Sequence, residues 1–476
     1  MTLNTLLPIG ALAALAAQSL AGAPGYTFQI QARTNFASNP GGSFNVPGNW
    51  FFSGEDIQLN DARQVSFHLS VTSGDFQSVW FGANGTGSVV YNSGTGGFLS
   101  QTSLNNVGRV IWAETFVAVP GIYRYDSGDN SSAFFTNKPL GSTGWSTPRI
   151  NNSGLAGYRV QFGFSGQAFV SFDPVTNTTA IHAAETGVDP LSPYSFLFTP
   201  SFNNARQIAG KVRYGPGTGN ERPDEIRIFN ADGSSILIAR DRDADPASPY
   251  TAFDNSVSLN NFGFVAFCAN LFGGGRAVFA SDGTTTLTIA STVGTGAQIS
   301  DLEFFAPSIN DNLQVVFRAK DLSGLRAIWV GDGSDLRRVV TEHDILPSDL
   351  GDARVDQNDA SPVFGGAPSI NQNGDVAFNA ALTPPDNNQI EWGTGVFVAI
   401  ADVPPACPGD ADGDGDSDST DLNIILTAFG CTPVPPAASG EAGNGDGDGC
   451  PGDLDADGDT DSTDLNILLT DFGCSG

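Results

Sequence analysis

Apolar and polar residues alternate in a motif that recurs along most of the chain. The motif has the form L-N-N-x-G-x-V-x-F, and its apolar positions two residues apart have the period of a β-strand with one buried face. Its Asn-rich start is typical of a turn, because Asn and Gly tolerate positive φ angles. The seven copies begin at Leu59, Leu104, Ile150, Phe202, Leu259, Ile309 and Ile370.

Each copy of the motif is followed by further strand patterns. A second apolar run follows, as at residues 276–280, and a turn such as Asp282-Gly283 then leads to a third run. The seventh copy has no third run, whereas residues 26–33 form an isolated strand pattern that could fill the gap. We therefore predict a mainly β protein in which residues 24–400 form a closed β-propeller of seven blades. An open β-solenoid and two packed β-sandwiches are the alternatives.

The C-terminal part follows a different pattern. Residues 407–431 and 450–474 repeat each other at an offset of 43, and each copy has alternating Asp residues followed by apolar residues at helical spacing. The Asp spacing fits the EF-hand loop D-x-D-x-D-G-x5-D/E, whose oxygen ligands suit Ca²⁺. We expect two Ca²⁺ ions, and a solvated acidic linker is the alternative. The predicted ligands are Asp410, Asp412, Asp414, Asp416, Asp418 and Asp421 in the first loop and Asp453, Asp455, Asp457, Asp459, Asp461 and Asp464 in the second.

A duplicated calcium loop with only an exiting helix resembles the type I dockerin module, which attaches secreted proteins to cohesin domains. The expected helices carry Leu422, Ile425, Leu426 and Phe429 on one face, as does the second copy. The resemblance implies that residues 407–476 form the module after a linker at 401–406. It also implies that Ser419, Thr420, Ser462 and Thr463 contact a cohesin-like partner.

Four of the five cysteines bracket the two repeats. The antiparallel helices that the dockerin resemblance implies favour the pairs Cys407–Cys474 and Cys431–Cys450, and pairing within each repeat is the alternative. Cys268, on an apolar strand pattern, is expected to be a buried free thiol.

Residues 1–23 are typical of a signal peptide, with an apolar run followed by small residues. A membrane anchor is the weaker alternative, and we expect no other membrane span. The cysteine usage also suits export, so we predict a secreted or cell-surface bacterial protein.

The formal net charge of −30 argues against a nucleic-acid partner, because phosphate binding needs basic patches. Of the 51 acidic residues, 17 lie from Ala401 onward, where there is no Lys or Arg. This tail therefore carries −17 of the net charge of −30, so over half of the net negative charge belongs to the predicted metal module.

No nucleophile elbow, zinc-protease motif or phosphate-binding loop is present, and no catalytic residue is assigned. The histidines His68, His182 and His343 lie in separate repeats, and acid pairs such as Asp224 with Glu225 are common in acidic proteins. The expected function is attachment of the propeller to a cohesin-like or cell-surface partner. The alternatives are a carbohydrate-active enzyme that cleaves O-glycosyl bonds of a polysaccharide and a structural or adhesive envelope protein. The repeat motif itself loosely resembles those of secreted bacterial propeller-like proteins, which implies no particular activity.

Overall fold

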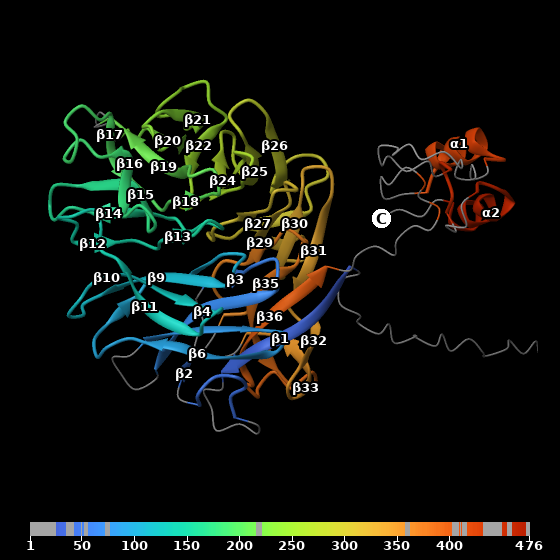
Figure 1. Ribbon diagram of the computed structural model, residues 1–476, viewed down its shortest axis with the longest axis horizontal. Helices are drawn as coiled ribbons and strands as arrows, with labels where there is room; N and C mark the ends of the chain where they lie inside the picture. The colour runs from blue at the N-terminus through green and yellow to red at the C-terminus, as the bar shows by residue number, and fades with distance from the viewer. Residues whose placement is uncertain are drawn as a thin grey trace, which may run out of the picture. The chain divides into compact units, whose positions relative to one another are not determined.

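The computed structural model describes residues 25–34, 42–48, 50–51, 56–71, 77–215, 221–357, 362–401, 409, 411, 417–431, 450–454 and 459–472. The chain divides into two compact units, Met1–Ile400 and Ala401–Gly476. The first unit contains seven antiparallel sheets, which confirms the predicted seven-bladed propeller (Figure 1). The described residues of the second unit include two short helices, α1 (Ser419–Ala428) and α2 (Ser462–Asp471).

The first three blades consist of β2 (Trp50–Phe51), β3 (Gln58–Leu59), β4 (Gln64–Val71), β5 (Gln77–Ala83) and β6 (Thr86–Asn92); β7 (Phe98–Leu99), β8 (Ser103–Leu104), β9 (Arg109–Thr115), β10 (Gly121–Asp126) and β11 (Ser131–Thr136); and β12 (Gly144–Trp145), β13 (Arg149–Ile150), β14 (Ala156–Gln161), β15 (Gln167–Asp173) and β16 (Thr178–Ala184).

The next three consist of β17 (Tyr194–Leu197), β18 (Ser201–Phe202), β19 (Ile208–Tyr214), β20 (Asp224–Phe229) and β21 (Ser235–Arg240); β22 (Tyr250–Phe253), β23 (Ser258–Leu259), β24 (Val265–Leu271), β25 (Arg276–Ser281) and β26 (Thr286–Ser291); and β27 (Ile299–Leu302), β28 (Ser308–Ile309), β29 (Val315–Asp321), β30 (Arg326–Gly331) and β31 (Leu336–Thr341). The seventh blade consists of β32 (Ile345–Ser348), β33 (Gly351–Val355), β34 (Ser369–Ile370), β35 (Val376–Thr383), β36 (Gly393–Ala401) and β1 (Tyr26–Thr34).

Each blade has an interrupted inner strand that the sequence patterns did not reveal. In the first blade β2 and β3 both pair with β4, at opposite ends of it, and β5 and β6 follow outward. The second short strand of each pair ends at the first residue of the motif. This apolar residue therefore lies in a strand and not in the turn that follows. These short pieces contact one another from β3 through β34 and back to β3, which closes a ring.

The N-terminal strand completes the last blade. Sheet order β1-β36-β35-β33-β32 places β1 beside β36, as Figure 1 shows in blue and orange, and this confirms the predicted closure. Arg33 on β1 is fully buried and holds this arrangement through Asp349, with Nε and Nη2 each 2.8 Å from a carboxylate oxygen. A bidentate pair of this kind fixes both side chains in one geometry, so it ties β1 to the turn between β32 and β33.

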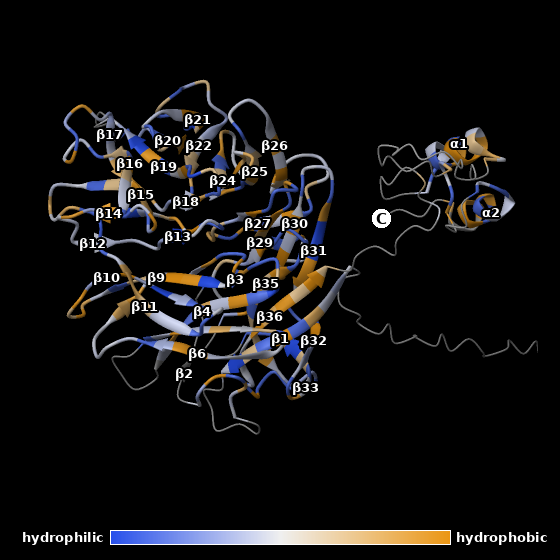
Figure 2. Ribbon diagram, in the orientation of Figure 1, coloured by the Kyte–Doolittle hydropathy of each residue, from blue (hydrophilic) through white to orange (hydrophobic). Residues whose placement is uncertain are grey.

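The hydrophobic core lies between neighbouring blades. Phe267 and Phe279 of the fifth blade stack with ring centroids 5.5 Å apart, and Trp329 of the sixth blade packs in the cluster that joins these two blades. Figure 2 shows hydrophobic residues in orange along strands such as β9 and β36. Cys268 is a buried free thiol in the same interblade cluster, which confirms its expected state. A blade therefore buries its faces only against its neighbours, and a closed ring leaves no face unpaired.

The first Asn of the motif links every blade to the next. In each copy its Nδ2 donates to the backbone oxygen of the equivalent Asn in the following blade, at distances of 2.9 to 3.3 Å. The last of these bonds, from Asn371 to Asn60, returns to the first blade. The asparagine ring consists of Asn60, Asn105, Asn151, Asn203, Asn260, Asn310 and Asn371, all buried.

The other end of the same side chain closes the turn of the motif. In Asn260, Oδ1 accepts hydrogen bonds from the backbone nitrogens of Phe262 and Phe264, at 3.0 and 2.9 Å. The same pair of bonds recurs at Asn60, Asn105, Asn151, Asn310 and Asn371. Asn is suited to this position because its carboxamide supplies both an acceptor and donors on one short side chain.

A second ring runs beside the first. The backbone nitrogen of the residue after each ring Asn donates to the side-chain oxygen of the equivalent residue in the next blade, at 2.8 to 3.1 Å. Its members are Asp61, Asn106, Asn152, Asn204, Asn261, Asp311 and Gln372. The two rings explain why the second and third residues of the motif are polar in every copy.

We expect the Asn260→Ala substitution to lower the free energy of unfolding by about 1–3 kcal/mol, because it leaves buried backbone groups without partners. Chemical denaturation of the full chain measures this change. The control is Asn388→Ala, at an exposed position, which should stay within about 0.5 kcal/mol of the parent protein. Equal effects of the two substitutions would contradict the role of the ring.

Candidate functional site

The two helices of the C-terminal unit begin at the predicted calcium loops in the same way. Asp418 and Asp461 cap them, and their side chains accept hydrogen bonds from the backbone nitrogens of Thr420 and Thr463, at 2.6 and 2.5 Å. In the first helix the Asp421 side chain accepts a hydrogen bond from the backbone nitrogen of Asp418, which completes a capping box. Asp464 accepts the equivalent bond from Asp461 in the second helix. The duplicated sequence therefore forms duplicated local structure.

The last acid of each loop pattern, at loop position 12, is Asp421 in the first loop and Asp464 in the second, and it holds the two ends of its loop together. The Asp421 carboxylate is fully buried, and its two oxygens accept from the backbone nitrogens of Ala411 and Asp418, at 2.7 and 2.8 Å. Asp464 is also fully buried and receives the equivalent bonds from Leu454 and Asp461, at 2.6 and 2.8 Å. Each carboxylate thus fixes the start and the end of its loop around one point.

The second loop brings several predicted ligands together. Carboxylate oxygens of Asp459, Asp461 and Asp464 lie within 4.8 Å of one another. Three negative charges this close repel one another, and hard oxygen donors in such a group suit Ca²⁺. The predicted ligands Asp410, Asp412, Asp414, Asp416, Asp455 and Asp457 lie outside the described residues, whereas Asp418, Asp421 and Asp453 lie within them.

A disulfide joins the two repeats. Cys431 follows the first helix and Cys450 precedes the second loop, and their Cα atoms are 5.7 Å apart. This confirms one of the two favoured pairs, and Cys407 and Cys474 lie outside the described residues. The link fixes the end of one repeat to the start of the other.

The predicted helices form, and only part of the apolar face of each one is buried. Ile425 and Leu468 are fully buried, but Leu426 and Phe429 are 55% and 50% exposed, and the second copy exposes Leu469 and Phe472 equally. Two ten-residue helices contact each other over a short stretch, so only part of each apolar face is covered. Ser419, Thr420, Ser462 and Thr463 are also exposed. Neither helix in the described part of the chain has the length and apolarity needed to cross a membrane.

The axis of the propeller has two polar mouths separated by apolar side chains. The short inner strands all run the same way along the axis, so the residues after them meet at one mouth and the residues before them at the other. All seven residues of the second ring and five of the ring asparagines line a cavity of about 170 Å³ at the first mouth. The apolar first residues of the motif, such as Ile150, Phe202 and Leu259, line the cavities at both mouths and separate them.

The second mouth, which we call the serine mouth, has a cavity of about 180 Å³. Its polar lining consists of Asp56, Gln58, Ser103, Arg149, Ser201, Ser258, Ser308 and Ser369. Burial lowers the pKa of the Arg149 guanidinium, and the negative charge of Asp56 opposes this effect. The sequence patterns did not single out this site, although the residues before the seven motifs could have been aligned.

The histidines do not come together. His68 lies on β4, His182 on β16 and His343 between β31 and β32. His182 is buried, with Nδ1 3.1 Å from the Phe229 carbonyl and Nε2 2.9 Å from Ser171 Oγ. Burial, with a smaller effect of Arg206, lowers its pKa to about 4. Its two partners occupy both ring nitrogens, so His182 is a structural residue.

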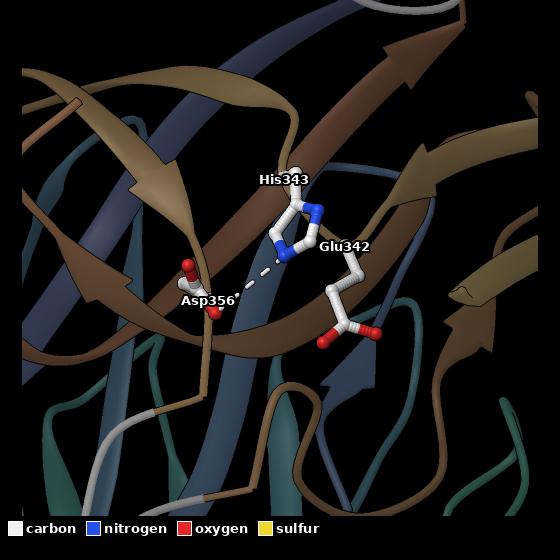
Figure 3. A group of neighbouring side chains, drawn as sticks. All are labelled: Glu342, His343 and Asp356. Carbon is white, nitrogen blue, oxygen red and sulfur yellow. Dashed lines mark ion pairs between the residues drawn. The ribbon is translucent and has the colours of Figure 1, made fainter. Parts of the chain in front are cut away.

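His343 lies in a group of possible metal ligands with Glu342 and Asp356 (Figure 3). Its Nε2 is 3.7 Å from Asp356 Oδ1, and the Arg354 guanidinium is 3.1 Å from the other Asp356 oxygen. Glu342 also accepts from the Arg326 backbone nitrogen. The neighbouring Arg354 already balances the Asp356 charge, so the group is explained as a contact between the sixth and seventh blades.

The acid pair Asp224 and Glu225, considered for glycosidase chemistry, forms salt bridges with basic residues. Asp224 pairs with Lys211 and Arg213, and Glu225 pairs with Arg227 and Arg240. A glycosidase needs one carboxyl group that can hold a proton and one free carboxylate. Basic side chains already contact the carboxylate oxygens of both acids, so neither acid is free to act on a substrate in that reaction.

Comparison with known proteins places the body in a family. Residues 97–398 match DUF7453, a family of unknown function, and the chain belongs to this family. No curated protein matches the chain.

Similar solved structures include TolB from Acinetobacter baumannii and an oligogalacturonate lyase in complex with manganese. TolB is 12% identical, with 59% of this chain and 64% of TolB covered and a TM-score of 0.39. The lyase is 14% identical, with 80% of this chain and 99% of the lyase covered and a TM-score of 0.44. The chain thus spans less than two thirds of the length of TolB.

We expect the stabilising effect of neutral His182 to be lost as the pH falls from about 6.5 to about 4. In this range the unfolded chain binds a proton that the folded chain does not, so acid favours unfolding. The difference in unfolding free energy between the parent protein and His182→Gln should therefore shrink by about 3 kcal/mol between pH 7 and pH 4. Denaturant titrations at several pH values measure it, and a constant difference would contradict the assignment.

Proposed function

We propose that this protein is a secreted, calcium-binding attachment protein, in which the C-terminal module docks the propeller body to a partner protein outside the cell. The observation that carries the proposal is the repeated loop geometry. Both position-12 acids are buried and hold the two ends of their loops, and the second loop gathers three carboxylates within 4.8 Å. This arrangement supports one Ca²⁺ ion per loop.

The ions would act by stabilising the fold of the module. Clustered carboxylates repel one another without a cation, and binding a cation to the folded loops stabilises the folded form. The Cys431–Cys450 disulfide supports a location outside the cytosol, because disulfides persist in oxidising compartments.

The exposed residues of the two helices support a protein partner. Each copy presents a Ser-Thr pair at the start of the helix and an exposed Leu and Phe towards its end. An apolar patch beside hydrogen-bonding side chains is typical of protein interfaces. The resemblance to dockerins indicates a cohesin-like domain as this partner, at the cell surface or in an extracellular assembly.

We expect the full chain to bind two Ca²⁺ ions and the Asp464→Asn variant to bind one, because the substitution removes a buried carboxylate from the second loop. Calorimetric titration of the chelator-treated protein gives the stoichiometry. The control is Asp386→Asn, an exposed acid of the body, which should leave two sites. Excess chelator should also abolish the helical circular-dichroism signal and leave the β signal of the propeller. Two sites in Asp464→Asn, or helicity insensitive to chelator, would contradict the calcium sites.

We expect the double variant Thr420→Asp/Thr463→Asp to bind a cohesin domain at least about tenfold more weakly than the parent protein, because it places charge on both docking surfaces. An acid in the first turn favours the helix, so the module should stay folded. Immobilised cohesin domains of several types, with calcium or chelator, provide the measurement. Absence of calcium-dependent binding to every cohesin would contradict this partner, while the calcium sites would still stand on the titration.

A further inference from the structure

The serine mouth departs from the sevenfold repeat at two positions. The residue before each motif is Ser in five blades, namely Ser103, Ser201, Ser258, Ser308 and Ser369. The two exceptions are Gln58 in the first blade and Arg149 in the third. All seven residues line the same cavity. Equivalent blades have equivalent packing at this position, and five of them are satisfied by Ser. The shared packing therefore does not explain why two blades have a large polar residue there.

Three of the five repeated serines have a structural role that Arg149 cannot take. Ser103, Ser201 and Ser258 each accept a hydrogen bond from the backbone nitrogen of the next motif, at 3.0 to 3.3 Å. A guanidinium has no acceptor, so Arg149 cannot make the equivalent bond to Phe202 in the fourth blade. The substitution of Ser by Arg therefore removes an interblade contact from the repeat.

The Arg149 guanidinium has few partners. Its Nη1 donates to Gln58 Oε1 over a long 3.4 Å, and no carboxylate lies within ion-pairing distance of it among the residues that the structure describes. The other N–H groups are available for a ligand, and a guanidinium binds a carboxylate through two parallel hydrogen bonds. At the same mouth, Asp56 Oδ1 accepts a hydrogen bond from the backbone nitrogen of Ala367, at 2.7 Å.

We propose that the serine mouth binds a small hydroxylated carboxylate such as a sugar acid, with Arg149 as the residue that recognises its charge. The serines that accept backbone hydrogen bonds still have their own O–H groups to donate. Gln58 and Asp56 can accept hydrogen bonds from ligand hydroxyl groups, and the negative charge of Asp56 disfavours a dianion. The cavity of about 180 Å³ has room for about six water molecules at roughly 30 Å³ each, which suits a small molecule.

An adjacent cavity extends this site outward between the fifth and sixth blades. Ala306 lines both cavities, and the outer one, of about 300 Å³, is also lined by Phe304 and Phe305. The Arg276 guanidinium lies 3.6 Å from the Phe304 ring centroid, and Phe304 is still 74% exposed. An exposed aromatic ring beside a polar cavity can pack against the apolar face of a sugar ring.

The experiment is calorimetric titration of the full chain with D-glucuronate, D-glucose and D-glucose 6-phosphate. We expect glucuronate to bind, glucose to bind at least about tenfold more weakly, and the dianionic phosphate to bind more weakly than glucuronate. Arg149→Ser should weaken glucuronate binding about tenfold or more. Because it restores the serine of the other blades, it should not lower the midpoint of denaturation. Arg149→Lys should retain part of the affinity, since it keeps the charge.

The control is Arg124→Ser, which makes the same change on β10, outside the cavity, and should leave binding unchanged. Failure of glucuronate to bind would overturn the proposal. So would equal binding of glucose, or unchanged binding in a folded Arg149→Ser variant. A preference for the phosphate would overturn the choice of a carboxylate. None of these outcomes depends on calcium binding by the C-terminal module.

Discussion

The closed ring of asparagine hydrogen bonds is the interaction on which the propeller depends. Each Asn joins the turn of its own blade to the backbone of the next, so the blades are linked at the axis by one repeated bond. These groups are buried, and a missing partner would leave a polar group unsatisfied in the interior. The ring therefore fixes how closely the blades approach one another and which residues face the axis.

This constraint also separates structural residues from candidate functional ones. Residues that the ring and the interblade core require recur in every blade, as the ring asparagines do. Arg149 and Gln58 stand where five blades have Ser, and they contact each other across the axis. In a repeat protein the shared residues are explained by the shared fold. A position where one blade differs from the others is therefore a candidate for a role beyond the fold.

The C-terminal module depends on a different interaction, the closure of each loop by a buried aspartate. The spacing of its acidic residues was visible in the sequence because the ligands proposed for one ion lie within twelve consecutive residues. The helix cap at Asp418 is likewise a local feature. The exposure of Leu426 and Phe429 was not predictable, since the apolar spacing of a helix does not say how much of its face a small partner covers.

The sequence alone determined the number of blades, the strands within each motif, the free strand that closes the ring and the two acidic loops. These features follow from periodicity and spacing within short segments, where backbone geometry dictates the pattern. Only the tertiary structure decided that the residue before each motif faces a common cavity, and that Arg149 lies there with few partners. The motifs are 45 to 61 residues apart in the chain, and only ring closure brings them to one axis.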